Sequence, residues 1–171
     1  MDVGRWNLER LTRPQFIMLC GVPTSGKSTY LANIPDIETY VVLSTDAYID
    51  DCAIRSGRGY SEIYSECIAE AQSHLNKELE RAVRENLNIV WDQTNLTPKA
   101  RKKKLSRIPA RYEKIGVWFK ISLEEALLRN QQRGGKVVPQ RVIMQMMSVF
   151  IPPVISEGFA NVAEKGSGVC V

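Results

Sequence analysis

The stretch Gly21-Val22-Pro23-Thr24-Ser25-Gly26-Lys27-Ser28 matches the phosphate-binding pattern G-x-x-x-x-G-K-[ST] at every fixed position. A short apolar run, 16–20, comes directly before it, and residues 28–32 can continue as a helix. A strand, a glycine-rich loop and a helix are the context that this pattern requires, since the backbone N–H groups of the loop and the helix N-terminus together attract an anion. The stretch therefore predicts a phosphate-binding loop in an α/β domain.

Short apolar runs alternate with longer amphipathic stretches through the rest of the chain. Four runs are rich in β-branched and aromatic residues, as strands buried on both faces are: 16–20, 40–43, 88–91 and 115–119. Helices are predicted at 61–85, from 97 towards 108, from 122 to 134 and from 139 onward, and Ser122 with Glu125 forms a capping-box pattern. The pattern predicts a three-layer P-loop α/β fold with a central, mostly parallel sheet of four to five strands.

Composition fits one compact domain over residues 1–171, because 44% of the residues are apolar and 25% are charged. The net charge of +4 is too small to identify a partner. The four cysteines lack C-x-x-C spacing, so no zinc site or redox motif is expected. The chain shows no signal-peptide pattern and no apolar run near the ~20 residues of a membrane span. We expect a cytoplasmic protein, in the host cytoplasm if the source is a phage, and a flexible tail at 165–171.

The loop residues 21–28, together with Thr29 directly after them, are predicted to bind ATP as the phosphate donor. Lys27 supplies a mobile positive charge to the β- and γ-phosphates, and the Ser28 hydroxyl can bind Mg²⁺. Asp92 follows the third predicted strand, where an aspartate can orient the Mg²⁺ shell or Ser28. These residues predict ATP and Mg²⁺ as the small molecules that the chain binds.

Asp46 and an arginine pair favour phosphate transfer over simple binding. Asp46 lies just past the second strand, at the sheet edge where ligands bind, and its carboxylate can take the proton of an attacking hydroxyl. Position alone slightly favours the alternative, an aspartate that caps a helix or a turn. Arg129 and Arg133 share one helix face before Gly134-Gly135, which suggests a mobile lid over residues 129–138 that neutralises developing charge. A solvated helix face is the alternative reading of this pair.

With these residues assembled, the chain resembles the P-loop polynucleotide 5′-kinases, especially the phage members, over roughly residues 15 to 150. The resemblance rests on the phosphate loop, on Asp46-Ala47-Tyr48, on 94–98, and above all on the block Arg129-Asn130-Gln131-Gln132-Arg133-Gly134-Gly135-Lys136-Val137-Val138-Pro139. It implies that Asp46 is the general base, that Lys27 and Ser28 bind ATP and metal, and that Arg133 is the catalytic lid arginine. It gives Arg129 a supporting role in ATP binding.

Three features depart from the family's phage members. An arginine that holds the 3′-phosphate of the acceptor is replaced by Ile49, with Arg55 or Arg58 as possible substitutes. The string Asp92-Gln93-Thr94-Asn95 is more similar to the eukaryotic end-processing kinases, and also to a kinase-like ribonucleoprotein domain thought to bind rather than catalyse. No phosphatase domain follows within the sequence.

Residues 97–114 contain eight basic side chains against one acid, Glu113, around a single predicted helix. Such a stripe is typical of a surface that binds a nucleic-acid backbone, here through Lys102, Lys103 and Lys104. A solubilising face is the alternative. The leading hypothesis is therefore ATP-dependent phosphorylation of a nucleic-acid hydroxyl, most simply the 5′-OH of DNA or RNA. Transfer to a hydroxymethylated base such as 5-hydroxymethyluracil in DNA, transfer to a small metabolite, and a non-catalytic nucleotide- or RNA-binding module stay open.

Overall fold

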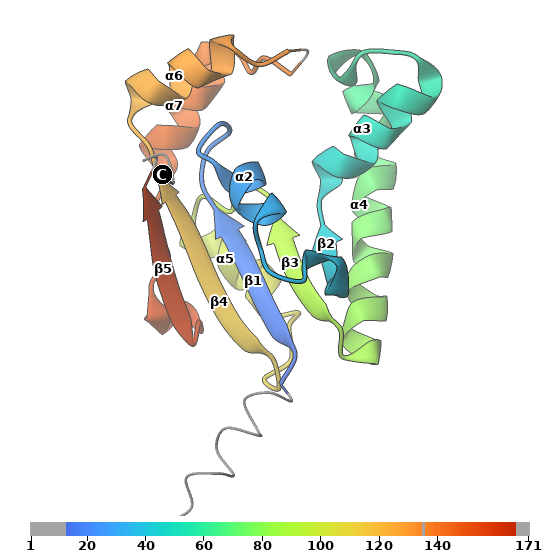
Figure 1. Ribbon diagram of the computed structural model, residues 1–171, viewed down its shortest axis with the longest axis vertical. Coiled ribbons are helices and arrows are strands. Elements are labelled where there is room, and N and C mark those ends of the chain that lie inside the picture. Colours follow the sequence, from blue (N-terminus) through green and yellow to red (C-terminus); the bar gives the residue numbers. More distant parts are fainter. Residues whose placement is uncertain (1–12, 135, 167–171) are drawn as a thin grey trace, which may run out of the picture.

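The computed structural model describes residues 13–134 and 136–166. Its centre is a sheet of five parallel strands in the order β2-β3-β1-β4-β5 (Figure 1). The strands are β1 (Gln15–Cys20), β2 (Tyr40–Leu43), β3 (Asn88–Asp92), β4 (Glu113–Lys120) and β5 (Asn161–Gly166). This confirms the predicted α/β fold and its four predicted strands, and it adds β5 at the edge of the sheet beside β4.

The helices are α2 (Lys27–Ala32), α3 (Thr45–Ser56), α4 (Tyr60–Glu85), α5 (Pro98–Leu105), α6 (Leu123–Gln131) and α7 (Gln140–Val149), with 3₁₀ turns η1 (Ile37–Thr39) and η2 (Ile155–Glu157). Sequence reasoning did not predict α3. It begins where the side chain of Ser44 accepts a hydrogen bond from the N–H of Ala47. It is then held by packing against α4, a contact that local sequence does not reveal.

Two hydrophobic clusters cover the two faces of the sheet. On one face, Leu75 and Leu79 of α4 and Leu105 of α5 pack with Phe16 and Trp91. On the other face, Tyr30 and Leu31 of α2 pack with the strand side chains that alternate with these, among them Ile17, Leu19, Val90 and Val117. Helix α2 therefore lies opposite α4 and α5, and the β1–loop–α2 connection comes out at the carboxyl edge of the sheet (Figure 1).

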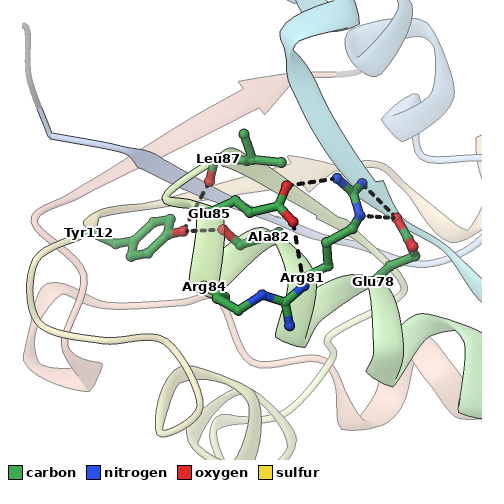
Figure 2. A network of polar contacts seen from close by, with 7 residues as sticks. All are labelled: Glu78, Arg81, Ala82, Arg84, Glu85, Leu87 and Tyr112. Carbon is green, nitrogen blue, oxygen red and sulfur yellow. Dashed lines mark hydrogen bonds and ion pairs between the residues drawn. The ribbon is translucent and has the colours of Figure 1, made fainter.

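At the amino-terminal edge of the sheet, polar contacts near the end of α4 stabilise the connections to the strands (Figure 2). The Tyr112 hydroxyl donates to the carbonyls of Ala82 at 3.1 Å and Leu87 at 3.0 Å. Arg81 pairs with Glu78 and Glu85 on the same helix. These contacts fix where α4 turns into β3 and where β4 begins, so that both strands reach the carboxyl edge in register.

Helices α5 and α6 begin at the capping residues that the sequence indicates. Thr97 caps α5 by accepting from the N–H of Ala100, and Ser122 caps α6 by accepting from the N–H of Glu125. The predicted capping box at Ser122 is only half formed, because the Glu125 carboxylate pairs with Arg129 at 2.6 Å instead.

Of the tail expected to be flexible, Lys165 and Gly166 belong to β5. The remainder, 167–171, lies outside the described residues.

Within the described parts of the chain, no helix combines the length and the apolar character needed to cross a membrane. The single-domain boundary 1–171 stays a prediction.

Candidate active site

The phosphate loop connects the buried end of β1 to α2. Gly26 has a φ of +102° and Thr24 a φ of +68°, so the chain turns twice through the left-handed region. Gly21 donates its N–H to the Thr94 carbonyl at 2.9 Å, and a Cβ added there would lie 2.6 Å from the Ser25 hydroxyl oxygen. The loop is therefore tightly wound, and this position accepts only glycine without rearrangement.

The loop presents donors that suit phosphate. The Lys27 ammonium donates to the carbonyls of Gly21 at 2.9 Å and Val22 at 2.8 Å, so it lies folded over the loop. Among the described residues, the Ser25 hydroxyl is the one buried side-chain polar group without a hydrogen-bond partner. A buried donor of this kind favours an anionic ligand, because burial without a partner is otherwise costly.

The first turn of α2 carries the last two residues predicted to bind ATP. Ser28 and Thr29 are both exposed there, unlike the buried Ser25 of the loop. The Thr29 carbonyl accepts a hydrogen bond at 2.7 Å from the side-chain amide of Asn33, the residue that caps the C-terminus of α2. This contact involves the Thr29 backbone, and the Thr29 side chain stays at the surface. The role of Thr29 in ATP binding therefore stays a prediction.

Charged residues from three other segments act on the charge of Lys27. Burial lowers the pKa of Lys27 to about 8, the charges of Asp92 and Asp46 oppose that shift, and Arg133 adds to it. Asp92, Asp46 and Arg133 therefore lie within electrostatic range of Lys27, and their roles at one site stay a prediction. Burial also raises the pKa of Asp92 against the opposing charge of Lys27.

Asp46 lies in the first turn of α3, just beyond the carboxyl end of β2. It is not the helix cap, since Ser44 has that role. Its Oδ1 accepts a hydrogen bond from the Tyr60 hydroxyl at 2.8 Å. Tyr60 is the first residue of α4 and carries no motif, so sequence reasoning missed it.

The residues predicted to hold Mg²⁺ fit that ion. Ser28 is exposed in the first turn of α2, and Asp92 ends β3 beside Leu19 of β1. Mg²⁺ in nucleotide sites takes one or two protein oxygens and completes its shell with phosphates and water. One hydroxyl and one carboxylate beside a phosphate loop supply that set.

The predicted lid segment, 129–138, begins in α6 and contacts the loop directly. Helix α6 ends at Gln131, so Arg133 lies beyond it, and the predicted helix face shared by Arg129 and Arg133 is wrong. Arg129 donates to the Thr24 carbonyl at 3.3 Å and pairs with Glu125 at 2.6 Å. Asn130 closes the segment after α6, because its side chain donates to the Val138 carbonyl at 2.7 Å and accepts from the Val138 N–H at 3.0 Å. Sequence reasoning assigned no role to Asn130, although it lies inside the Arg129–Pro139 block.

A cavity of about 260 Å³ lies next to the loop. Its lining combines loop residue Val22 with side chains from the end of β4 and from α7 and the segment after it, including Trp118, Met147 and Phe150. The Trp118 and Phe150 rings lie 6.1 Å apart. Such an apolar, aromatic-lined cavity beside a phosphate loop is suited to bind a flat aromatic ring.

The basic segment 97–114 is not a uniform surface stripe. Arg101 is fully buried and makes a bidentate ion pair with Glu157 at 2.7 Å. Lys104 turns inward, donating to Gln93 at 2.6 Å and to Asn95 at 2.5 Å, and burial lowers its pKa to about 8. Lys104 is therefore half-buried, whereas Lys102 and Lys103 are exposed, and the contact of all three with nucleic acid stays a prediction.

Ile49 is a core residue and offers no charge to a phosphate. It is fully buried in the cluster that joins α3 to α4, with Ile63 and Ala71. Of its possible substitutes, Arg58 makes a bidentate pair with Glu66 at 2.8 and 2.9 Å. Arg55 donates to the Asp51 carbonyl and the Cys52 sulfur. None of these contacts places either guanidinium beside Asp46.

The chain matches the family model described as AAA domain over residues 16–153, and it belongs to that family. A candidate kinase from Chloroflexus aurantiacus J-10-fl shares 16% identity, with 91% of this chain and 89% of that chain covered, at a TM-score of 0.67. A gluconokinase from Sinorhizobium meliloti 1021 shares 16% identity, with 91% and 84% covered, at 0.55. A chain of the Pnkp1/Rnl/Hen1 complex shares 21% identity, with 68% and 39% covered, at 0.50.

These likenesses show a P-loop kinase-like fold. At identities of 16–21% these likenesses show the fold and nothing about the substrate. The names of the three similar proteins also point to different activities.

Proposed function

We propose that this chain is an ATP-dependent phosphotransferase that moves the γ-phosphate of ATP to a hydroxyl group. The observation that supports the proposal is that the charges of Asp92, Asp46 and Arg133 all act on Lys27 of the phosphate loop. A protein that only binds nucleotide needs the loop lysine, but it has no need of a carboxylate on the far side of the phosphates.

The chemistry assigns one role to each residue. The acceptor oxygen forms a bond to the γ-phosphorus, the bond to the β–γ bridging oxygen breaks, and ADP leaves with that oxygen. Asp46 takes the acceptor's proton, and Lys27 and Arg133 neutralise charge on the phosphoryl oxygens. When bound at Ser28 and Asp92, Mg²⁺ supplies further neutralisation of the β- and γ-phosphates. The cavity beside Val22 provides a place for the nucleotide base.

For the acceptor, the polynucleotide 5′-hydroxyl stays the finer proposal. It is supported by the resemblance of the Arg129–Pro139 block and by the exposed pair Lys102 and Lys103. A second acceptor class, a small alcohol, is favoured by the surroundings of Asp46. Its helix carries Asp50 and Asp51, and the position expected to hold a 3′-phosphate is the buried Ile49. Ile49 offers that phosphate no positive charge, and Asp51 adds a negative charge to the same helix.

The test is transfer of label from γ-labelled ATP to a panel of acceptors. The panel contains 5′-OH DNA and RNA oligonucleotides, 5-hydroxymethyluracil DNA, nucleosides and sugar acids. Asp46→Asn is the matched variant, because the amide keeps the size of the side chain but cannot take the proton. It should lose about 10²–10⁴-fold in transfer rate while still binding ATP.

Wild-type transfer to one class identifies the acceptor. Absence of transfer to every hydroxyl would favour the binding module, and near wild-type transfer by Asp46→Asn would remove Asp46 as the base.

A further inference from the structure

One lysine of the lid segment contacts the side of the site that carries Asp46. Lys136, two residues after Gly134, makes an ion pair with Asp50 of α3. Its ammonium also lies 4.4 Å from the centroid of the Tyr60 ring. Figure 1 shows the α6–α7 connection extending across the carboxyl edge of the sheet toward α3. The lid segment therefore reaches over to the α3–α4 pair as well as to the phosphate loop.

Tyr60 joins that lid contact to the base. Its ring faces Lys136, and its hydroxyl donates to Asp46 Oδ1 at 2.8 Å. Burial and the hydrogen bond to Asp46 both raise the pKa of Tyr60, so the phenol stays protonated and remains a donor. In the part of the chain that the structure describes, Oδ2 of Asp46 accepts no hydrogen bond. That oxygen is left for the proton of an acceptor.

We infer that Tyr60 is a positioning residue for Asp46, held in place by Lys136 when the lid lies over the site. The inference rests on the proposed phosphotransferase function. Asp46 is exposed, and without a partner its side chain would rotate between several staggered positions. One hydrogen bond to Oδ1 selects an orientation, and a base in a fixed orientation is worth more in rate than in binding.

The kinetic test compares two tyrosines one helical turn apart. Tyr60→Phe removes the donor but keeps the ring under Lys136. Tyr64→Phe is the matched control, because Tyr64 is 43% exposed and only its ring contacts Tyr60, at 5.8 Å. Loss of a hydrogen bond to a charged group should lower kcat about 10- to 100-fold in Tyr60→Phe, with the KM for ATP unchanged. Tyr64→Phe should match the wild type.

A double variant separates positioning from a general structural role. In the Asp46→Asn background, Tyr60→Phe should cause little further loss, because the residue acts only through the carboxylate. Equal losses in both backgrounds, or equal kcat in the Tyr60 and Tyr64 variants, would overturn the inference. Thermal melting of each variant checks that the fold is retained.

A second measurement needs no acceptor. Carbon-13 NMR of labelled tyrosine rings follows each phenol through pH, and Tyr60→Phe identifies the Tyr60 signal by its disappearance. In Asp46→Asn the Tyr60 signal should titrate at lower pH than in the wild type. Lys136→Met should shift it at neutral pH, whereas Lys77→Met, at an exposed lysine of α4, should not.

The two arms distinguish the two claims. If the wild type transfers phosphate to no acceptor, the proposed function fails and the NMR arm still decides the contact. An unchanged Tyr60 titration in Asp46→Asn overturns the inference whatever the kinetics show.

Discussion

Nucleotide binding should be accompanied by uptake of a proton at Lys27, in an amount that depends on pH. In the free protein burial lowers the pKa of Lys27 to about 8, so roughly half of the molecules carry a neutral amine at pH 8. Phosphate oxygens beside the ammonium favour its charged form and raise the pKa again, toward the ordinary value of 10.5 or above. Binding selects the protonated form, and affinity should therefore fall as pH rises through about 8.

The magnitudes follow from that single pKa. The charged fraction of Lys27 falls from about 0.9 at pH 7 to about 0.1 at pH 9, so the Kd for ATP should rise about tenfold between them. Each bound ATP should take up about 0.1 proton at pH 7, about 0.5 at pH 8 and about 0.9 at pH 9. Isothermal titration calorimetry in buffers of different ionisation enthalpy measures both quantities at fixed Mg²⁺.

Two variants assign the proton. Burial also lowers the pKa of Lys104 to about 8, but its ammonium donates hydrogen bonds to Gln93 and Asn95. Lys104→Met should therefore leave the proton uptake unchanged. Lys27→Met should bind ATP weakly and without uptake. A wild-type Kd that is flat between pH 7.5 and pH 9.5, or negligible uptake at pH 8, would refute the assignment of Lys27 as the buried, half-neutral phosphate ligand.

Three further outcomes are expected. Arg133→Ala should lower kcat more than it raises the KM for ATP, since a lid arginine acts where charge develops; a change in KM alone would make it a ground-state ligand. Replacing Lys102 and Lys103 with serine should flatten the salt dependence of oligonucleotide binding by up to about two charges, and an unchanged slope in a filter-binding assay would return them to a solvated face. Arg101→Met should lower the free energy of unfolding by about 3–5 kcal/mol in a urea titration, because it leaves the Glu157 carboxylate buried without its partner. Glu157→Gln in the same chain should recover part of that loss, and no recovery would contradict the reasoning.

The parts of the fold that sequence predicted are those specified by local signals. The phosphate loop has fixed glycines and a lysine, and the four predicted strands, β1 to β4, are marked by continuous apolar runs, so both are visible without tertiary information. Strand β5 was missed because Asn161–Gly166 is an edge strand with mostly exposed side chains, and no apolar run marks it. Helix α3 was missed because it depends on Ile49 packing against α4, a contact between segments.

The basic segment shows a signal that was present but not used. Arg101, Leu105 and Ile108 recur at helical spacing and are all buried, so the arginine belongs to the apolar face of α5. Counting charges along the segment hid this periodicity. The partner of Arg101, Glu157, is 56 residues away, and no spacing rule could have supplied it.

The site divides in the same way. Lys27, Ser28, Asp46 and Asp92 could be predicted because each lies at or just past the end of a strand at the carboxyl edge, where parallel strands bring their ends together. Tyr60 and Lys136 contact that site only through the fold. Tyr60 starts a helix whose far end lies at the opposite edge of the sheet, and Lys136 becomes its neighbour when the α6–α7 connection crosses the site.

That crossing gives the segment 129–138 contacts on both sides of the candidate site. At one end Arg129 donates to Thr24 of the phosphate loop, and at the other Lys136 pairs with Asp50, on the helix that carries the proposed base Asp46. Asn130 fixes the two ends relative to each other through its two hydrogen bonds to Val138. Both contacts therefore belong to one position of the lid. A change that loosens Asn130 should weaken both together, whereas a change at Lys136 alone should spare the contact with the loop.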